Sequence, residues 1–166
     1  MAGYGDDTGF AAYIAALGYT LPSGAPASAV LRQRGSDYLD ALYNAPVDPK
    51  APRFSGYPTD PLVQERAYPR TGATAYGSAV ASDVIPTAII NASYAAAWHE
   101  ASNPGSLAVA ATASRAVKRK KIDVIETEFF AGSGNVAADA TVRISAVEGL
   151  VAPFLTRAEV GSIYIV

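Results

Sequence analysis

The stretch DVIPTAIINASYAAAWHEA, Asp83 to Ala101, decides how this chain folds. Apolar side chains recur at helical spacing along two of its faces. One face carries Ile85, Ala88, Ile89, Ala92 and Ala96, and the other carries Ile90, Tyr94, Ala97 and Trp98. Because this part of the chain holds almost no formal charge, both faces are expected to be buried. The sequence therefore predicts a central helix, capped by Ser82 or Asp83, with Pro86 in its first turn.

Three further segments share the helical periodicity and complete the predicted bundle. They cover residues 8–18 with Thr8 as N-cap, residues 28–43, and residues 139–151 before Pro153. The predicted fold class is mainly α (α+β), a bundle of about four helices with a long extended arm loop, one β-strand or hairpin region before the last helix and a short C-terminal β-type tail. One domain is expected over residues 1–166, because a chain of this length builds a single core.

Residues 44–80, between the second and third predicted helices, contain six of the 11 prolines. The same segment carries four aromatic residues, Phe54, Tyr57, Tyr68 and Tyr76. Long loops inside a compact domain are uncommon, and disordered segments are poor in aromatic residues. The sequence therefore predicts an extended arm that orders against a neighbouring subunit, with Tyr57, Tyr68 and Arg70 as contact residues. A loosely held loop is the alternative.

The segment SRAVKRKKIDVIETEFF, residues 114–130, is basic in its first half and β-prone in its second. Its first half holds the cations Arg115, Lys118, Arg119, Lys120 and Lys121. Glu126 and Glu128 follow among Ile, Val, Thr and Phe residues. Since no Asn-Gly or Asp-Gly turn interrupts the run, the strand region 115–130 is not expected to form a two-residue hairpin by itself. Its charge order matches an antiparallel copy of itself, so pairing across subunits is predicted.

Two other interpretations of the basic run stay open. The lysines form a solvated strand edge that discourages aggregation, or the five cations grip nucleic acid through its phosphates. Against nucleic acid, the chain has a net charge of −2, and no aromatic residue is interleaved with the cations.

The C-terminal tail, residues 156–166, ends in the β-type run Ser162–Val166. An unpaired strand of this kind exposes backbone hydrogen-bonding groups. Ile163, Tyr164 and Ile165 are therefore predicted to pair with the 115–130 strand or with a partner protein.

The chain lacks the residues that most catalytic and metal sites require. It has no cysteine and a single histidine, His99, so neither a zinc site nor a Ser-His-Asp triad is expected. The glycine-rich AGSGN at residues 131–135 lacks the Lys of a phosphate-binding loop. No enzyme activity, cofactor or metal is predicted, and neither a signal peptide nor a membrane span is expected.

Several stretches, in this order along the chain, carry a resemblance to a known family. They are DDTGFAAYIAALGYTLP, LRQRGSDYLDALY, QERAYPRTG, IPTAIINASYAAAWHEA, AVKRKKIDVIETEF and VEGLVAPFLT. Together they resemble the head-to-tail adaptors, or connectors, of tailed phages. Some members of that family are labelled DnaT-like single-stranded-DNA-binding proteins. The sequence departs from the family at KRKKIDVIE, which lacks a Gly-Pro often found there.

The resemblance implies a structural virion protein of the phage neck, assembled in the host cytoplasm. Such a protein forms a ring, typically of twelve copies, beneath the portal protein. The ring extends the channel for packaged double-stranded DNA and docks the stopper or tail-terminator protein. The DnaT-like label implies instead a single-stranded-DNA-binding protein that uses residues 115–121.

Overall fold

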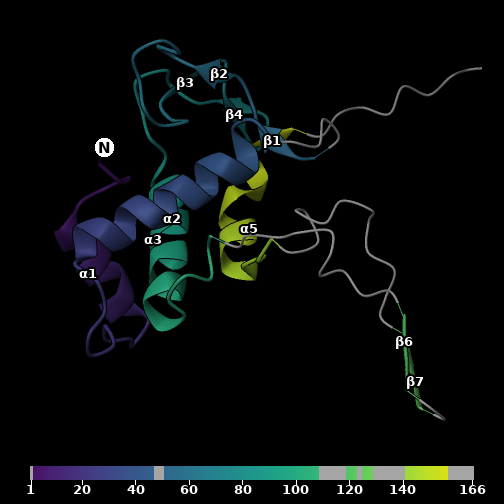
Figure 1. The fold of residues 1–166 in the computed structure, drawn as a ribbon. Helices are drawn as coiled ribbons and strands as arrows, with labels where there is room; N and C mark the ends of the chain where they lie inside the picture. Colours follow the sequence, from purple (N-terminus) through teal and green to yellow (C-terminus); the bar gives the residue numbers. More distant parts are fainter. Residues whose placement is uncertain (1, 47–50, 109–118, 123–124, 129–140, 157–166) are drawn as a thin grey trace, which may run out of the picture.

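Helix α3 (Thr87–Ser102) lies at the centre of the computed structural model and contacts α1, α2 and α5 (Figure 1). These helices span Asp7–Ala16, Ser28–Tyr43 and Ser145–Val151, and the 3-10 helix η2 (Ala152–Phe154) continues α5. The structure describes residues 2–46, 51–108, 119–122, 125–128 and 141–156, with only the backbone at 119–122 and 125–128. The predicted mainly helical α+β fold with a central third helix is confirmed.

Small residues allow α2 and α3 to pack closely. A Cβ atom at Gly35 of α2 would collide with the Ser93 carbonyl oxygen and would lie 2.8 Å from the Ala97 nitrogen. Ser93, Ala96 and Ala97 of α3 are fully buried. The two backbones therefore meet where neither helix carries a large side chain, which explains the alanine-rich composition of α3.

Helix α2 has the predicted bounds, but the other three helices begin at different residues from those predicted. Helix α1 is capped by Asp6, whose Oδ1 accepts a hydrogen bond of 2.7 Å from the Gly9 N–H, and not by Thr8. Helix α3 begins after Pro86 and not at Asp83, because Pro86 has an extended backbone with ψ of 138°. Helix α5 begins after the extended residue Ile144 and not at residue 139.

The arm folds back over the helices of its own chain (Figure 1). Its short strands are β1 (Arg53–Phe54), β2 (Tyr57–Pro58), β3 (Arg70–Thr71), β4 (Thr74–Ala75) and β5 (Ser78–Ala79). The antiparallel pairs are β2 with β3 and β4 with β5, while β1 pairs with β8 (Leu155–Thr156). The arm is thereby joined to the chain segment that follows η2.

Aromatic side chains of the arm are part of the core. The rings of Phe54 and Tyr68 meet edge to face at 5.1 Å, and both side chains are fully buried. Tyr43 of α2 lies 5.5 Å from Phe54, and Phe154 of η2 lies 6.4 Å from Tyr68. The prediction that the arm orders against a neighbouring subunit is therefore wrong for these rings, because the chain's own helices bury them.

Strands β6 (Arg119–Ile122) and β7 (Ile125–Glu128) form an antiparallel hairpin within the chain. The register pairs Arg119 with Glu128 and Lys121 with Glu126. The prediction that this strand needs a partner from elsewhere is wrong. The register places residues of opposite charge at facing positions within one chain, although the run contains no Asn-Gly or Asp-Gly turn.

The C-terminal tail is described only at its start. Strand β8 at Leu155–Thr156 pairs with β1, while Ile163, Tyr164 and Ile165 lie outside the described residues. Among the helices that the structure describes, none has the length and apolar character needed to cross a lipid bilayer.

Candidate functional site

An open cleft of about 340 Å³ lies between the loop that follows α1, helix α3 and the start of α5. Its lining comprises Tyr13, Leu17, Tyr19, Ala95, Trp98, His99, Ser102, Asn103, Ile144 and Ala146. The volume falls within the range typical of sites for small organic groups. Since the lining contains no Asp, Glu, Lys or Arg, aromatic and neutral polar groups determine what the cleft can hold.

Two stacked aromatic rings form one wall of the cleft. The rings of Tyr19 and Trp98 are nearly parallel, with an angle of 8° between their planes and a centroid separation of 4.8 Å. Tyr19 is 46% exposed, so this pair is open to solvent. Beneath it, Tyr13 and Phe10 of α1 pack against Tyr94 of α3 at 5.8 and 5.6 Å. The buried rings of Phe10 and Tyr94 and the partly buried ring of Tyr13 thus anchor α1 to α3, which places Tyr19 over Trp98.

The polar part of the cleft comes from the last turn of α3. His99, Ser102 and Asn103 lie there, and the Asn103 side-chain amide donates a hydrogen bond of 3.3 Å to the His99 carbonyl oxygen. No described residue forms a hydrogen bond with the His99 imidazole. This end of a helix carries partial negative charge from its unpaired carbonyl groups. Because the lining also contains no Lys or Arg side chain, the cleft is suited to an uncharged group.

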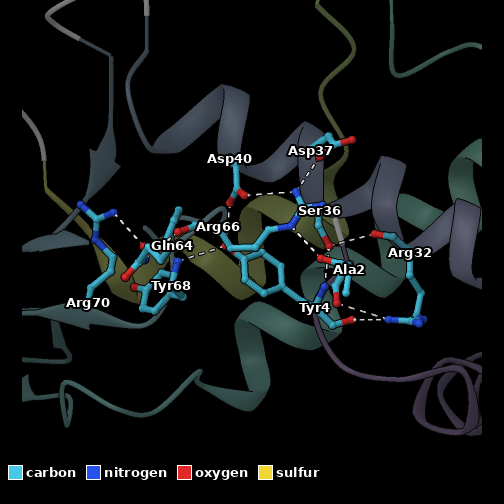
Figure 2. Close-up of polar contacts among 12 residues, drawn as sticks. Ala2, Tyr4, Arg32, Ser36, Asp37, Asp40, Gln64, Arg66, Tyr68 and Arg70 are labelled. Atoms are coloured by element: carbon cyan, nitrogen blue, oxygen red, sulfur yellow. Dashed lines mark hydrogen bonds and ion pairs between the residues drawn. The ribbon is translucent and has the colours of Figure 1, made fainter. Parts of the chain in front are cut away.

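A second set of polar residues joins the N-terminal segment, α2 and the arm (Figure 2). The Tyr4 hydroxyl donates to Asp40 Oδ1 at 2.6 Å and accepts from the Tyr68 backbone N–H at 3.2 Å. Arg66 pairs with Asp37 and Asp40 from the arm side. These contacts link three segments that lie far apart in the sequence.

Buried arginines secure both ends of this network. Arg32 of α2 donates through Nη1 to the carbonyl oxygens of Gly3, Tyr4 and Gly5 and pairs with Asp7 at 2.8 Å. Arg70 of β3 is only 3% exposed. Its guanidinium donates to the Ser55, Gly56 and Ala67 carbonyl oxygens and to Asn44 Oδ1, at 2.7–3.1 Å. Among the described residues its acceptors are all uncharged.

Burial shifts the ionisation of the network. Burial raises the pKa of Asp40, although hydrogen bonds from Tyr4 and the charge of Arg66 oppose that shift. Burial and the Asp40 carboxylate together raise the pKa of Tyr4 far above its ordinary value. Burial raises the pKa of Tyr68 to about 12 and lowers that of Arg70. Desolvation is the largest cause of each shift, and the hydrogen bonds of this network form a structural clamp on the arm.

The predicted contact residues of the arm therefore divide into two groups. Tyr68 and Arg70 were expected at an interface with another subunit, but both are buried within their own chain. That expectation is corrected, because Arg70 satisfies the arm's own carbonyl groups and Tyr68 packs between Phe54 and Phe154. Tyr57 is 59% exposed and remains available for contact.

The predicted basic residues are placed by backbone register alone. Arg119 and Lys121 stand opposite Glu128 and Glu126, whereas Lys120 stands opposite the neutral Thr127. Arg115 and Lys118 lie outside the described residues. Within the described part of the chain, no group of three or more His, Asp or Glu residues is placed to hold a metal ion.

Residues 4–166 match the protein family described as "Putative DnaT-like ssDNA binding protein". The chain belongs to this family. Comparison with curated proteins found no match, and comparison with solved structures found none either. The DnaT-like part of the sequence resemblance is thus supported along almost the whole chain, while the phage adaptor role stays a prediction.

Sequence patterns do not predict the cleft in this DnaT-like protein. They place Trp98 on a helix face that is expected to be buried, and no aromatic ring lies among the cations of the basic run. Tyr19 lies 79 residues before Trp98 in the sequence, so no local pattern joins them. The one available signal was the coincidence of the chain's single tryptophan and single histidine at adjacent positions.

Proposed function

We propose that the protein binds single-stranded DNA and acts as a binding protein, not as an enzyme. The match of residues 4–166 to the DnaT-like family carries this proposal. Strand β6 supplies a means of contact, because it carries Arg119, Lys120 and Lys121. Successive residues of a strand alternate between its two faces, so Arg119 and Lys121 share one face and Lys120 lies on the other. Cations on either face can neutralise phosphates of a nucleic-acid strand.

The register of the β6–β7 hairpin indicates which of these cations should contribute most to phosphate binding. Arg119 and Lys121 each stand opposite a glutamate, which competes with phosphate for their charge. Lys120 stands opposite Thr127 and has no acidic residue across the ladder. Lys120 is therefore the residue of β6 that we expect to contribute most to phosphate binding.

The test measures binding of a labelled oligo-dT by fluorescence anisotropy at several salt concentrations. Loss of one phosphate contact makes the slope of log affinity against log salt less negative by about 0.7 for single strands. We expect Lys120→Gln to cause this change and Lys121→Gln to cause less. Arg53→Gln is the control, because Arg53 is an exposed cation of β1 on the arm. Equal slopes for all four proteins, or no binding by the parent, would contradict the proposal.

A second candidate function is the head-to-tail adaptor, and the exposed apolar residues of the arm favour it. Leu62 is 95% exposed, Val63 is 75% exposed and Tyr76 is 88% exposed. Leu62 and Val63 are adjacent in the sequence, and neighbouring exposed apolar side chains are typical of surfaces that bind another protein. In this role the chain assembles into a ring at the portal, lines the path of packaged double-stranded DNA and docks the stopper or tail-terminator protein in the virion neck.

Light scattering over a range of concentrations, with and without a portal protein, tests the second candidate. The adaptor role predicts a ring of about the size that the family resemblance implies, alone or on the portal, and its loss in Leu62→Ser. Val30→Ser is the matched control, because Val30 is an exposed residue at the start of α2, outside the arm. A monomer under all these conditions would exclude the adaptor role.

A further inference from the structure

The cleft beside Trp98 has a chemistry that points to one kind of occupant. Its lining combines the stacked Tyr19–Trp98 pair with His99, Ser102 and Asn103, and it includes no residue of fixed charge. A phosphate would find no Lys or Arg side chain there. The first turn of α5 also lines the cleft, but that helix has only seven residues, whereas the carboxyl end of the 16-residue α3 carries a partial charge that repels anions. The cleft is therefore suited to a flat, uncharged ring with polar edges.

A nucleobase that is not paired meets this description. Unpaired bases stack on exposed aromatic side chains and form hydrogen bonds through their edges. Tyr19 offers an accessible ring, while the His99 imidazole and the Asn103 amide lie on the same cleft wall of α3. The DNA backbone would then be held elsewhere, which agrees with a basic run that follows α3 in the sequence.

We propose that the Tyr19–Trp98 cleft binds an unpaired base of single-stranded DNA. This proposal rests on the proposed single-strand-binding function and assigns the base-binding part of it to named residues. Paired bases are buried in the duplex stack and cannot enter the cleft, so the site discriminates between single and double strands. Stacking of one base on an aromatic side chain strengthens binding roughly fivefold to more than a hundredfold.

Trp98 provides a direct readout, because it is the only tryptophan in the chain. Titration with an oligo-dT of about 16 nucleotides, near the upper site size of a single-strand-binding domain, is expected to quench or shift Trp98 emission. A duplex of equal length is expected to leave that emission unchanged. An equal response to the duplex would overturn the proposal.

Substitutions at Tyr19 test whether the stacked pair itself binds the base. Tyr19→Ala is expected to weaken oligo-dT binding by about tenfold, and Tyr19→Phe is expected to restore it because the ring is kept. The control is Tyr76→Ala, which removes an exposed ring from the β4–β5 turn of the arm. Thermal unfolding of each variant confirms that the fold is kept. Equal affinity of Tyr19→Ala and Tyr76→Ala would overturn the proposal.

Parallel anisotropy measurements separate this proposal from the function on which it rests. If labelled oligo-dT binds while Trp98 emission stays constant and Tyr19→Ala binds normally, the cleft is not the base site and single-strand binding still stands. If labelled oligo-dT does not bind at all, the proposed function fails and the cleft proposal fails with it.

Discussion

The contact between α2 and α3 and the contact between the arm and the helices stabilise the same core by different means. The first brings two backbones together through small residues, with Gly35 against Ser93 and Ala97. The second joins irregular chain to helix through buried arginines and tyrosines, with Arg70 holding four uncharged acceptors. The difference follows from the backbone. Helices satisfy their own N–H and C=O groups, whereas an irregular segment needs side chains to satisfy them.

Of the substitutions that test these two contacts, removal of the Arg70 side chain should lower the unfolding free energy most. Arg70→Ala removes the donor of four hydrogen bonds, of which those to the Ser55 and Ala67 carbonyl oxygens are buried, so we expect a loss of about 3–5 kcal/mol in unfolding free energy. Arg70→Lys should recover only part of it, because an ammonium group cannot reach all four acceptors in the geometry of a guanidinium. Urea denaturation measures both variants.

Arg53→Ala is the control for Arg70, since Arg53 belongs to the same arm and is exposed. We expect it to change the unfolding free energy by less than about 0.5 kcal/mol. If Arg70→Ala were no more harmful than Arg53→Ala, the guanidinium would not hold the arm, and aromatic packing alone would explain its position.

A methyl group at Gly35 tests the helix contact in the same way. Gly35→Ala forces the α2 and α3 backbones apart, and we expect a loss of about 2–3 kcal/mol, typical of an overpacked core. Gly149→Ala in α5 is the matched control, because no atom lies near the position of the added Cβ. That change should stabilise the protein by about 0.5–1 kcal/mol through helix propensity. Thermal and urea unfolding distinguish the two, and stabilisation by both would disprove close backbone contact at Gly35.

Removal of the hydroxyl group of Tyr4 or of Tyr68 should have the smallest effect on stability. Tyr4→Phe removes a hydroxyl that bonds to both Asp40 and the Tyr68 backbone, so we expect a loss of about 1–2 kcal/mol. Tyr68→Phe removes a buried hydroxyl that has no hydrogen-bond partner among the described residues, so stability at pH 7 should be unchanged or slightly higher. A larger loss for Tyr68→Phe than for Tyr4→Phe would contradict this ranking.

The difference in stability between the parent protein and Tyr68→Phe is expected to depend on pH. The folded protein raises the pKa of Tyr68 to about 12, above the value of about 10 expected for an unfolded chain. This difference stabilises the protonated, folded form below pH 10, and the contribution is lost as the pH rises through about 12. Parent protein should therefore lose more stability than Tyr68→Phe over that interval, as measured by urea unfolding at a series of alkaline pH values.

Much of the helical part could be predicted from the sequence, because its signals are local. The bounds of α2 and the burial of α3 follow from residues three and four positions apart, which one helix face brings together. The prediction was less accurate at the helix ends. Asp6 replaced Thr8 as the cap of α1, and the extended backbone of Pro86 delayed the start of α3.

The candidate site could not be predicted from such local signals. Proline content and aromatic residues correctly marked residues 44–80 as unusual, but they could not show that the arm's own chain buries Tyr68 and Arg70. Likewise, the basic run was visible, while its in-chain pairing with Glu126 and Glu128 was assigned to a neighbouring copy.

The amino-acid order by itself determined where helices form and which of their faces are apolar, because each helix is a repeat of neighbouring residues. Only the tertiary structure decided which arginines are internal and which aromatic rings meet. Arg70 donates a hydrogen bond to Asn44, and Tyr19 stacks on Trp98, although long stretches of chain separate the two residues of each pair. Such contacts depend on how whole elements pack, and the desolvation of a charge or the stacking of two rings exists only after that packing has formed.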